Sequence, residues 1–139
     1  MNISEINVNE FTTPMVVTIG PEDSLDVALE YMQNNQIRHL PVTENGDVVG
    51  IVSERDVLVN IGKSWSRLVK IGDIMNTDLL TVSETDNLSD VAYQLASQKK
   101  GSAIVVDQSG NLSGIFTTTD ALNALVEILN PLARGKSDL

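Results

Sequence analysis

The chain of 139 residues has no cysteine, a single histidine and no long apolar run. Without cysteine it can form neither a disulfide framework nor a thiolate nucleophile or metal site, and one histidine cannot complete a transition-metal cluster. No apolar run approaches the roughly 18 residues of a membrane-spanning helix. The first residues lack the basic start and the apolar core of a signal peptide. We therefore expect a cytoplasmic protein with no metal and no membrane segment.

Basic residues are scarce. The formal net charge is −10, which argues against binding to nucleic acid or to anionic membranes, because both rely on broad basic surfaces. Residues 1–62 contain ten acidic residues but only two basic ones, Arg38 and Arg55. These two arginines, with the only histidine, His39, fall inside the motifs described below.

The patterns that mark an enzyme are missing as well. The chain has no glycine-rich phosphate loop, no nucleophile with an adjacent base, and no carboxylate pair that stands out as an acid–base couple. Apolar residues make up 42% of the chain and charged residues 20%, which is ample for the packed interior of an ordinary soluble protein. We predict that the protein is not an enzyme.

What the sequence does contain is an internal repeat. Residues 50–58 read Gly-Ile-Val-Ser-Glu-Arg-Asp-Val-Leu, and residues 114–122 read Gly-Ile-Phe-Thr-Thr-Thr-Asp-Ala-Leu, a constant 64 positions later. Earlier positions align at an offset of 63, as Thr18 does with Thr81, so we place one extra residue of the second repeat near residues 98–100. The predicted repeats are residues 8–62 and 70–130, joined by a linker at about 60–70 and followed by a tail, 131–139.

Each repeat predicts a strand, a helix, two strands and a second helix. Strands are expected where short β-forming runs end in turn residues, and Asn45-Gly46 is the strongest hairpin signal. Pro41 suggests an edge strand or the start of a strand, since proline cannot donate to the ladder. The expected strands are 14–19, 37–43, 48–52, 78–82, 103–106 and 112–116. The expected helices start at Asp23 or Ser24, at about Ser53, at Asp86 and at about Thr117, the second ending near residue 59 and the last at Leu129.

This order of elements, together with the hexapeptide Ile-Arg-His-Leu-Pro-Val at 37–42 and the Gly-apolar-apolar-(Ser/Thr)-x-x-Asp motif, strongly resembles the CBS domain, named for cystathionine β-synthase. The resemblance covers residues 8–130. It implies an α/β (α+β) fold in which tandem β-α-β-β-α CBS repeats pack sheet to sheet into one compact module. Such Bateman-type modules commonly dimerise and bind adenosine compounds between the repeats. Because no catalytic domain is attached, the resemblance implies a stand-alone regulatory module.

The resemblance assigns the ribose of a ligand to Asp56 and Asp120, with the hydroxyls of Ser53 and Thr117 on ribose or phosphate. A carboxylate can accept both hydroxyls of a ribose, and the start of a helix favours an anion such as a phosphate. The same spacing is also typical of a capping box, in which the hydroxyl caps an N–H group and the carboxylate reaches back. Both interpretations stay open, and the roles could alternate.

Phosphate contacts are expected from Arg38, His39 and Arg55, because arginine offers several planar donors. The alternatives are surface arginines paired with acids such as Glu54, and a structural histidine. We align Ser102, Ala103 and Thr119 with these three positions, so the second site lacks their basic groups. Lys100, next to Lys99, can substitute, or both lysines can complement the end of a helix. Thr119 completes the predicted phosphate-binding set, and we expect two unequal sites.

The adenine is expected between apolar strand residues and backbone hydrogen-bonding groups. The candidates are Thr18, Ile37 and Pro41 in the first repeat, and Thr81, Gly101 and Val105 in the second. Gly101 can let a flat base approach the backbone, or it can end a helix. All six residues are equally compatible with plain sheet packing.

We therefore predict a homodimeric regulatory module that senses AMP, ADP, ATP or S-adenosylmethionine and has no obligatory cofactor. Binding would shift a pre-existing conformational equilibrium that an unknown protein partner reads. The alternative is a ligand-free structural module for dimerisation or protein interaction.

Overall fold

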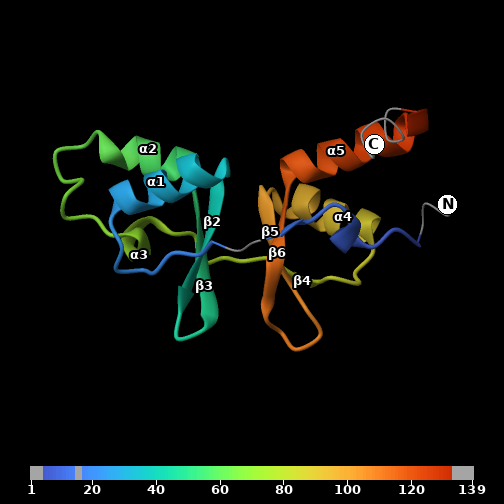
Figure 1. The fold of residues 1–139 in the computed structure, drawn as a ribbon, viewed down its shortest axis with the longest axis horizontal. Coiled ribbons are helices and arrows are strands. Elements are labelled where there is room, and N and C mark those ends of the chain that lie inside the picture. Colours follow the sequence, from blue (N-terminus) through green and yellow to red (C-terminus); the bar gives the residue numbers. More distant parts are fainter. Residues whose placement is uncertain (1–4, 15–16, 133–139) are drawn as a thin grey trace. The chain divides into compact units, whose positions relative to one another are not determined.

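The computed structural model describes residues 5–14 and 17–132, which form two compact units (Figure 1). The first-repeat unit comprises the described residues 17–79. The second-repeat unit comprises residues 5–14 and 80–132. Two residues of the strand predicted at 14–19, Met15 and Val16, lie outside the described residues, as do residues 133–139 of the predicted tail.

The first-repeat unit is built on a hairpin covered by helices. Strand β2 pairs antiparallel with β3, and the helices follow the expected order. One further short helix, α3, lies at the start of the predicted second repeat, in residues to which the sequence assigned no element. The elements are α1 (Leu25–Asn35), β2 (His39–Glu44), β3 (Asp47–Ser53), α2 (Glu54–Ile61) and α3 (Ile71–Ile74).

The second-repeat unit contains a four-stranded sheet in the order β1-β6-β5-β4. Strands β4 and β5 are parallel and are connected by α4, whereas the other neighbours are antiparallel. The elements are the 3-10 helix η2 (Val8–Glu10), β1 (Thr13–Pro14), β4 (Thr81–Ser83), α4 (Leu88–Gln98), β5 (Ser102–Val106), β6 (Leu112–Thr117) and α5 (Thr118–Leu129).

Each unit takes its outermost strand pairing from a lead-in segment at the start of the other repeat. Thr13, near the start of the first repeat, pairs with Ile115 of β6. Asn76, near the start of the second repeat, pairs with Ile51 of β3 through two backbone hydrogen bonds of 3.0 and 2.8 Å. The units in space are therefore not the consecutive repeats of the sequence, because the two lead-in segments are exchanged.

The strand register corrects the alignment of the two repeats. His39 pairs with Ser53, and Ser102 pairs with Thr117, so His39 corresponds to Ser102 rather than to Ala103. Likewise Arg38 corresponds to Gly101, because their carbonyl groups accept from the first N–H group of α2 and α5. The predicted extra residue near 98–100 is wrong.

The extra residue lies in the second hairpin turn. Two residues connect the strands of the first hairpin, Asn45 and Gly46, with φ angles of 53° and 85°. Both residues adopt the left-handed backbone conformation that the tightest hairpin turns require, so the hairpin predicted from Asn-Gly is confirmed. In the second hairpin three residues, 108–110, separate Asp107 from its partner Asn111, and Gly110 has φ 82°. A three-residue turn with a left-handed glycine is the next most common solution.

Pro41 lies in the middle of β2, not at its start, and its missing N–H group shortens the parallel pairing. The carbonyl of Pro41 accepts from Ile19 N, so its nitrogen also faces the Ile19 segment rather than β3. At the corresponding position of the second unit, Ile104 N donates to Leu80 O at 2.8 Å and a parallel strand, β4, forms. In the first unit only an isolated bridge at Ile19 remains.

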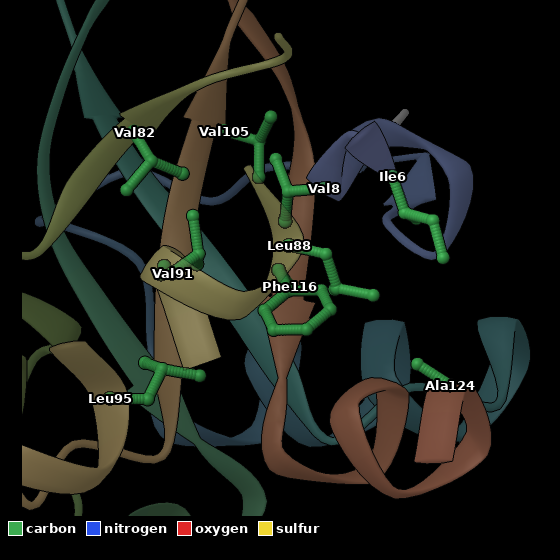
Figure 2. Close-up of a cluster of buried hydrophobic side chains, with 10 residues drawn as sticks. Ile6, Val8, Val82, Leu88, Val91, Leu95, Val105, Phe116 and Ala124 are labelled. Carbon is green, nitrogen blue, oxygen red and sulfur yellow. The ribbon is translucent and has the colours of Figure 1, made fainter. Parts of the chain in front are cut away.

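Each unit has its own apolar core, formed where the helical stripes meet the sheet. Figure 2 shows the second core, in which fully buried Phe116 of β6 lies among Val8, Leu88 and Val91. The predicted stripes of α1 and α4 are buried at Leu25, Ala28, Met32, Leu88, Val91 and Leu95. The remaining predicted positions, Leu29 and Ala92, are half-buried.

Two predicted helix ends need correction. Ser24 caps α1 as expected, but Asn87, not Asp86, caps α4 by accepting from Ser89 N at 2.9 Å. Asp86 instead accepts from Ser83 N. At the other end of α4 the left-handed cap residue is Lys99, so Gly101 does not end the helix. Helix caps were misplaced by one or two residues because several neighbouring side chains are competent to cap.

The motif glycines lie directly against the exchanged lead-in segments. A β-carbon on Gly114 would contact the backbone carbonyl oxygen of Thr13, and one on Gly50 would lie 2.5 Å from the sulfur of Met75. The first obstacle is a strand backbone, whereas the second is a flexible side chain that can move. A β-carbon on Gly101, by comparison, would point into open space, with no atom beyond its chain neighbours within 4 Å.

Gly114→Ala should lower the free energy of unfolding by about 1–3 kcal/mol, as overpacking against a rigid neighbour does. Gly50→Ala should cost less, and Gly101→Ala is the matched control with little effect. Urea denaturation monitored by circular dichroism measures all three. Equal losses for Gly50→Ala and Gly114→Ala would contradict the distinction between side-chain and backbone contact.

Candidate functional site

Both copies of the repeated motif form the same corner between a strand and a helix. Ser53 is the N-cap residue of α2, and its hydroxyl accepts from Asp56 N at 3.1 Å. Thr117 is the N-cap residue of α5, and its hydroxyl accepts from Asp120 N at 3.2 Å. Of the two hydrogen bonds that make a capping box, the one accepted by the hydroxyl is therefore present in both units.

The second hydrogen bond of a capping box, from the backbone N–H of the cap residue to the carboxylate, is present only at Asp120. One of its oxygens, Oδ2, accepts from Thr117 N at 2.9 Å and from the Thr117 hydroxyl at 3.1 Å. The Thr13 hydroxyl donates to Oδ1 at 3.0 Å and lies 3.3 Å from Oδ2. Asp120 is half-buried and completes a full capping box, so the protein itself already occupies this carboxylate.

Asp56 differs from Asp120 in its surroundings. Its side chain is exposed, and its carboxylate has no hydrogen-bond or ion-pair partner within the part of the chain that the structure describes. It does not reach back to the backbone of Ser53. The first-repeat corner therefore presents a carboxylate that is free to accept two hydroxyl groups.

Two arginines belong to the same corner: Arg55 directly precedes Asp56 in the chain, and the backbone of Arg38 is bonded to the first residue of the helix, Glu54. The carbonyl of Arg38 accepts from Glu54 N at 2.8 Å, which fixes its backbone at the first turn of α2, and Arg55 lies within that turn. Both side chains are exposed, and neither has an ion-pair partner among residues 5–14 and 17–132. The alternative that these arginines pair with Glu54 is therefore not observed. His39 is half-buried and faces Ser53 across the ladder.

Ion pairing does occur nearby, between Lys70 and Glu22 at 2.8 Å. The hydrogen bond from Lys70 to Glu22 and the negative charge of Glu22 raise the pKa of Lys70. This exposed pair contributes little to stability, but it shows that a basic side chain of the unit can find an acid, whereas Arg38 and Arg55 do not.

The N-termini of the two motif helices offer an anion fewer unpaired N–H groups than the sequence predicts. At α2, Glu54 N donates to Arg38 O and Asp56 N donates to the Ser53 hydroxyl. At α5, Thr118 N donates to Gly101 O at 3.0 Å in the same way. Since these donors already have acceptors, an anion at the first-repeat corner depends on arginine side chains more than on the helix N-terminus.

The second-repeat corner has no arginine. Gly101, Ser102 and Thr119 occupy the positions of Arg38, His39 and Arg55, and Gly101 and Thr119 are exposed. Lys100 follows the left-handed cap of α4 and corresponds to Ile37, and its side chain has an interaction within the structure. The expected inequality of the two corners stays a prediction for binding, but their chemical difference is plain.

The six predicted adenine contacts are spread over different environments. Thr18 is half-buried and accepts a hydrogen bond from Thr43 at 3.3 Å. Ile37 is half-buried and packs against the first core, and Pro41 is buried. In the second unit Thr81 and Gly101 are exposed, whereas the side chain of Val105 is fully buried in the core.

Two residues at the corners were missed by sequence reasoning. Thr13 touches Asp120, and Asn76 occupies the matching place beside Ile51. Neither belongs to the repeated motif, and only the exchange of lead-in segments brings them there. Their common offset of 63 residues was the signal available in the sequence.

The structure adds two findings about absent features. Within the described residues no group of three His, Cys, Asp or Glu side chains could bind a metal ion. In the same residues no helix is both long enough and apolar enough to cross a bilayer.

Fold and corners define a tandem α+β repeat module with one Ser/Thr-x-x-Asp corner per unit. The CBS domain model matches residues 8–63 and again residues 71–127. The chain belongs to the CBS domain family.

The chain is similar both to proteins of about its own length and to a part of much longer proteins. A CBS domain-containing protein of Dictyostelium discoideum is 27% identical over 92% of this chain and 97% of its own length. The crystal structure of CBSX2 in complex with AMP is 32% identical, with a TM-score of 0.73 over 89% of this chain and 98% of that chain. An inosine-5'-monophosphate dehydrogenase of Korarchaeum cryptofilum is 37% identical over 76% of this chain, which spans only 21% of that enzyme.

Replacing each motif aspartate by alanine should lower the free energy of unfolding by different amounts at the two corners. Asp120→Ala loses the capping box and the Thr13 bond, so the free energy of unfolding should fall by about 1–3 kcal/mol. Asp56→Ala loses only a favourable charge in the first helical turn, less than about 1 kcal/mol. Asp26→Ala in α1, another first-turn acid, is the control for that charge effect. Urea unfolding in which Asp56→Ala costs as much as Asp120→Ala would show that Asp56 also caps its helix.

Proposed function

We propose that this protein is a regulatory module that binds an adenosine nucleotide at the Asp56 corner. The observation that carries the proposal is the pairing state of this corner: an exposed carboxylate and two arginines, none of them with a charged partner in the described residues. The three groups lie around the start of one helix and are open to a ligand that brings both hydroxyl donors and negative charge.

The chemistry of the corner fits the two polar parts of a nucleotide. The Asp56 carboxylate can accept from both ribose hydroxyls, while Arg38 and Arg55 can donate several hydrogen bonds to a phosphate. The base would then contact the apolar surface near Thr18 and Ile37. The AMP complex of CBSX2, 32% identical to this chain, supports an adenosine nucleotide as the ligand class.

Charge favours a phosphorylated ligand over S-adenosylmethionine. S-adenosylmethionine carries two positive groups, the sulfonium and the amino group, against one carboxylate, so it offers two arginines without acidic partners less negative charge than a phosphate does. A phosphate would instead replace the missing acidic partners of both side chains. Within the predicted set of ligands, AMP, ADP and ATP are therefore the better candidates.

A regulatory role follows from binding without catalysis. A nucleotide that prefers one arrangement of the protein shifts the population toward it, by no more than its difference in affinity for the two states. A partner protein that recognises this arrangement would read the signal.

The exposed face of α5 is the proposed dimer surface. Leu122, Leu125, Val126 and Leu129 are all more than half exposed and follow the i, i+3, i+4, i+7 spacing of one helix face. A continuous apolar stripe of this kind on a soluble domain is typical of an interface. A second copy of the chain, presenting the same stripe, would bury it in a symmetric dimer.

Titration calorimetry with AMP, ADP, ATP and S-adenosylmethionine tests the ligand. We expect heat with the nucleotides, and about 10- to 100-fold weaker AMP binding for Asp56→Ala, since a hydrogen-bonded charge is removed. Arg38→Ala and Arg55→Ala should each weaken binding about 10-fold. Arg67→Ala, an exposed arginine outside the motifs, is the control. Absence of heat with every adenosyl compound would leave the ligand-free interaction module as the function.

The dimer is tested by light scattering after gel filtration. Leu125→Glu with Leu129→Glu places two charges in the α5 stripe and should give a monomer, because burying unpaired carboxylates is costly. Leu68→Glu, at an 82% exposed leucine outside every helix, should stay dimeric. A wild-type chain that already elutes as a monomer would exclude this interface.

A further inference from the structure

The contact between Thr13 and Asp120 joins the lead-in segment to the second-repeat corner. Thr13 is part of the two-residue strand β1, and its hydroxyl donates to Asp120 Oδ1 at 3.0 Å across 107 positions of sequence. The other oxygen, Oδ2, accepts from the backbone N–H and hydroxyl of Thr117. No other donor among the described residues bonds to Oδ1, so Thr13 occupies the one oxygen that the capping box leaves over.

A ligand that uses both oxygens of Asp120 would meet donors already in place. Each carboxylate oxygen accepts about two hydrogen bonds; the Thr13 hydroxyl takes one of the places on Oδ1, and the N–H and hydroxyl of Thr117 take both places on Oδ2. A ribose that uses both oxygens, as proposed for Asp56, cannot do so without disturbing either Thr13 or the capping box. The protein contact therefore competes directly with a ligand.

The first-repeat corner has a different residue at the same place. Asn76 pairs with Ile51 as Thr13 pairs with Ile115, and residues opposite one another in an antiparallel pair share a face of the sheet. Its Oδ1 accepts from Asp78 N at 2.9 Å, so its side chain is engaged with its own segment. No hydrogen bond between Asn76 and Asp56 exists in the described part of the chain.

We propose that the residue at this lead-in position determines which corner accepts a nucleotide. Thr13 closes the Asp120 corner from within the protein, and Asn76 leaves the Asp56 corner open. The chain consequently binds one nucleotide, and filling the second corner requires release of the Thr13 hydroxyl. This inference rests on the proposed function of the Asp56 corner, but it concerns a contact and a residue that the binding motif does not contain.

A reciprocal exchange at the two lead-in positions tests the proposal, with AMP as the probe in titration calorimetry. Wild type should bind one AMP per chain. Thr13→Val keeps the shape of the side chain but removes the donor, so a second AMP should bind, at least about 10-fold more tightly than any second event in wild type. That second site should disappear again in Thr13→Val with Asp120→Asn. Asn76→Thr places a hydroxyl near Asp56 and should weaken the first site about 10-fold.

Two controls separate the hydroxyl from general damage to β1. Thr13→Ser keeps the donor and should bind one AMP like wild type. Thr12→Val removes a hydroxyl that donates to Val8 O, not to Asp120, and should also leave the stoichiometry at one. If Thr13→Val does not fold, Asn76→Thr, which alters the other unit, still decides the matter.

The possible failures are distinguishable. One AMP bound by both wild type and folded Thr13→Val, or unchanged affinity in Asn76→Thr, overturns the role of the lead-in residue and leaves the Asp56 site intact. Two equal sites in wild type do the same. No AMP bound by any variant overturns the proposed function, and this inference with it.

Discussion

The pairing of each lead-in segment with the last strand of the other repeat is the constraint on which the rest of the structure depends. Thr13 with Ile115 and Asn76 with Ile51 each close one sheet edge. The pairing brings a backbone or a side chain against Gly114 or Gly50, which explains why the motif begins with glycine. It also places one lead-in side chain beside each motif helix. A change in this pairing would therefore alter the fold and the corner together.

The sequence predicted the repeated elements well because their signals are local. Hydrophobic spacing, the Asn-Gly turn and the Ser/Thr-x-x-Asp corner all lie within a few residues of one another. The predicted alignment of the two repeats was wrong because it placed the extra residue beside Gly101 instead of in the turn at 108–110. Both placements give the same sequence offsets before Gly101 and after the turn. Only the pairing of Ser102 with Thr117 separates these alternatives. Thr13 and Asn76 were missed because their contacts span tens of residues and no local pattern marks them.

The two corners show how one motif supports two physical states. In both, a hydroxyl caps the helix and an aspartate follows three residues later. At Asp120 the capping box is complete and Thr13 adds a further donor. At Asp56 the carboxylate is exposed, and the side chain of the lead-in residue there, Asn76, accepts from the backbone N–H of Asp78. The capping and binding interpretations of the motif are thus not exclusive: capping is complete at Asp120, and binding is what we propose for Asp56.

This division of roles accounts for the placement of charge in an acidic protein. A corner whose carboxylate is satisfied internally needs no nearby cation, and Gly101 and Thr119 stand where the other corner has Arg38 and Arg55. A corner with an open carboxylate and two arginines gains from a ligand that carries both hydroxyl donors and a phosphate. Arginines are present at the corner with the open aspartate, Asp56, and absent from the corner with the closed one, Asp120. In the function proposed here, the lead-in difference that leaves Asp56 open would let the arginines bind the phosphate of the same ligand, and so link the lead-in segment to the chemistry of the site.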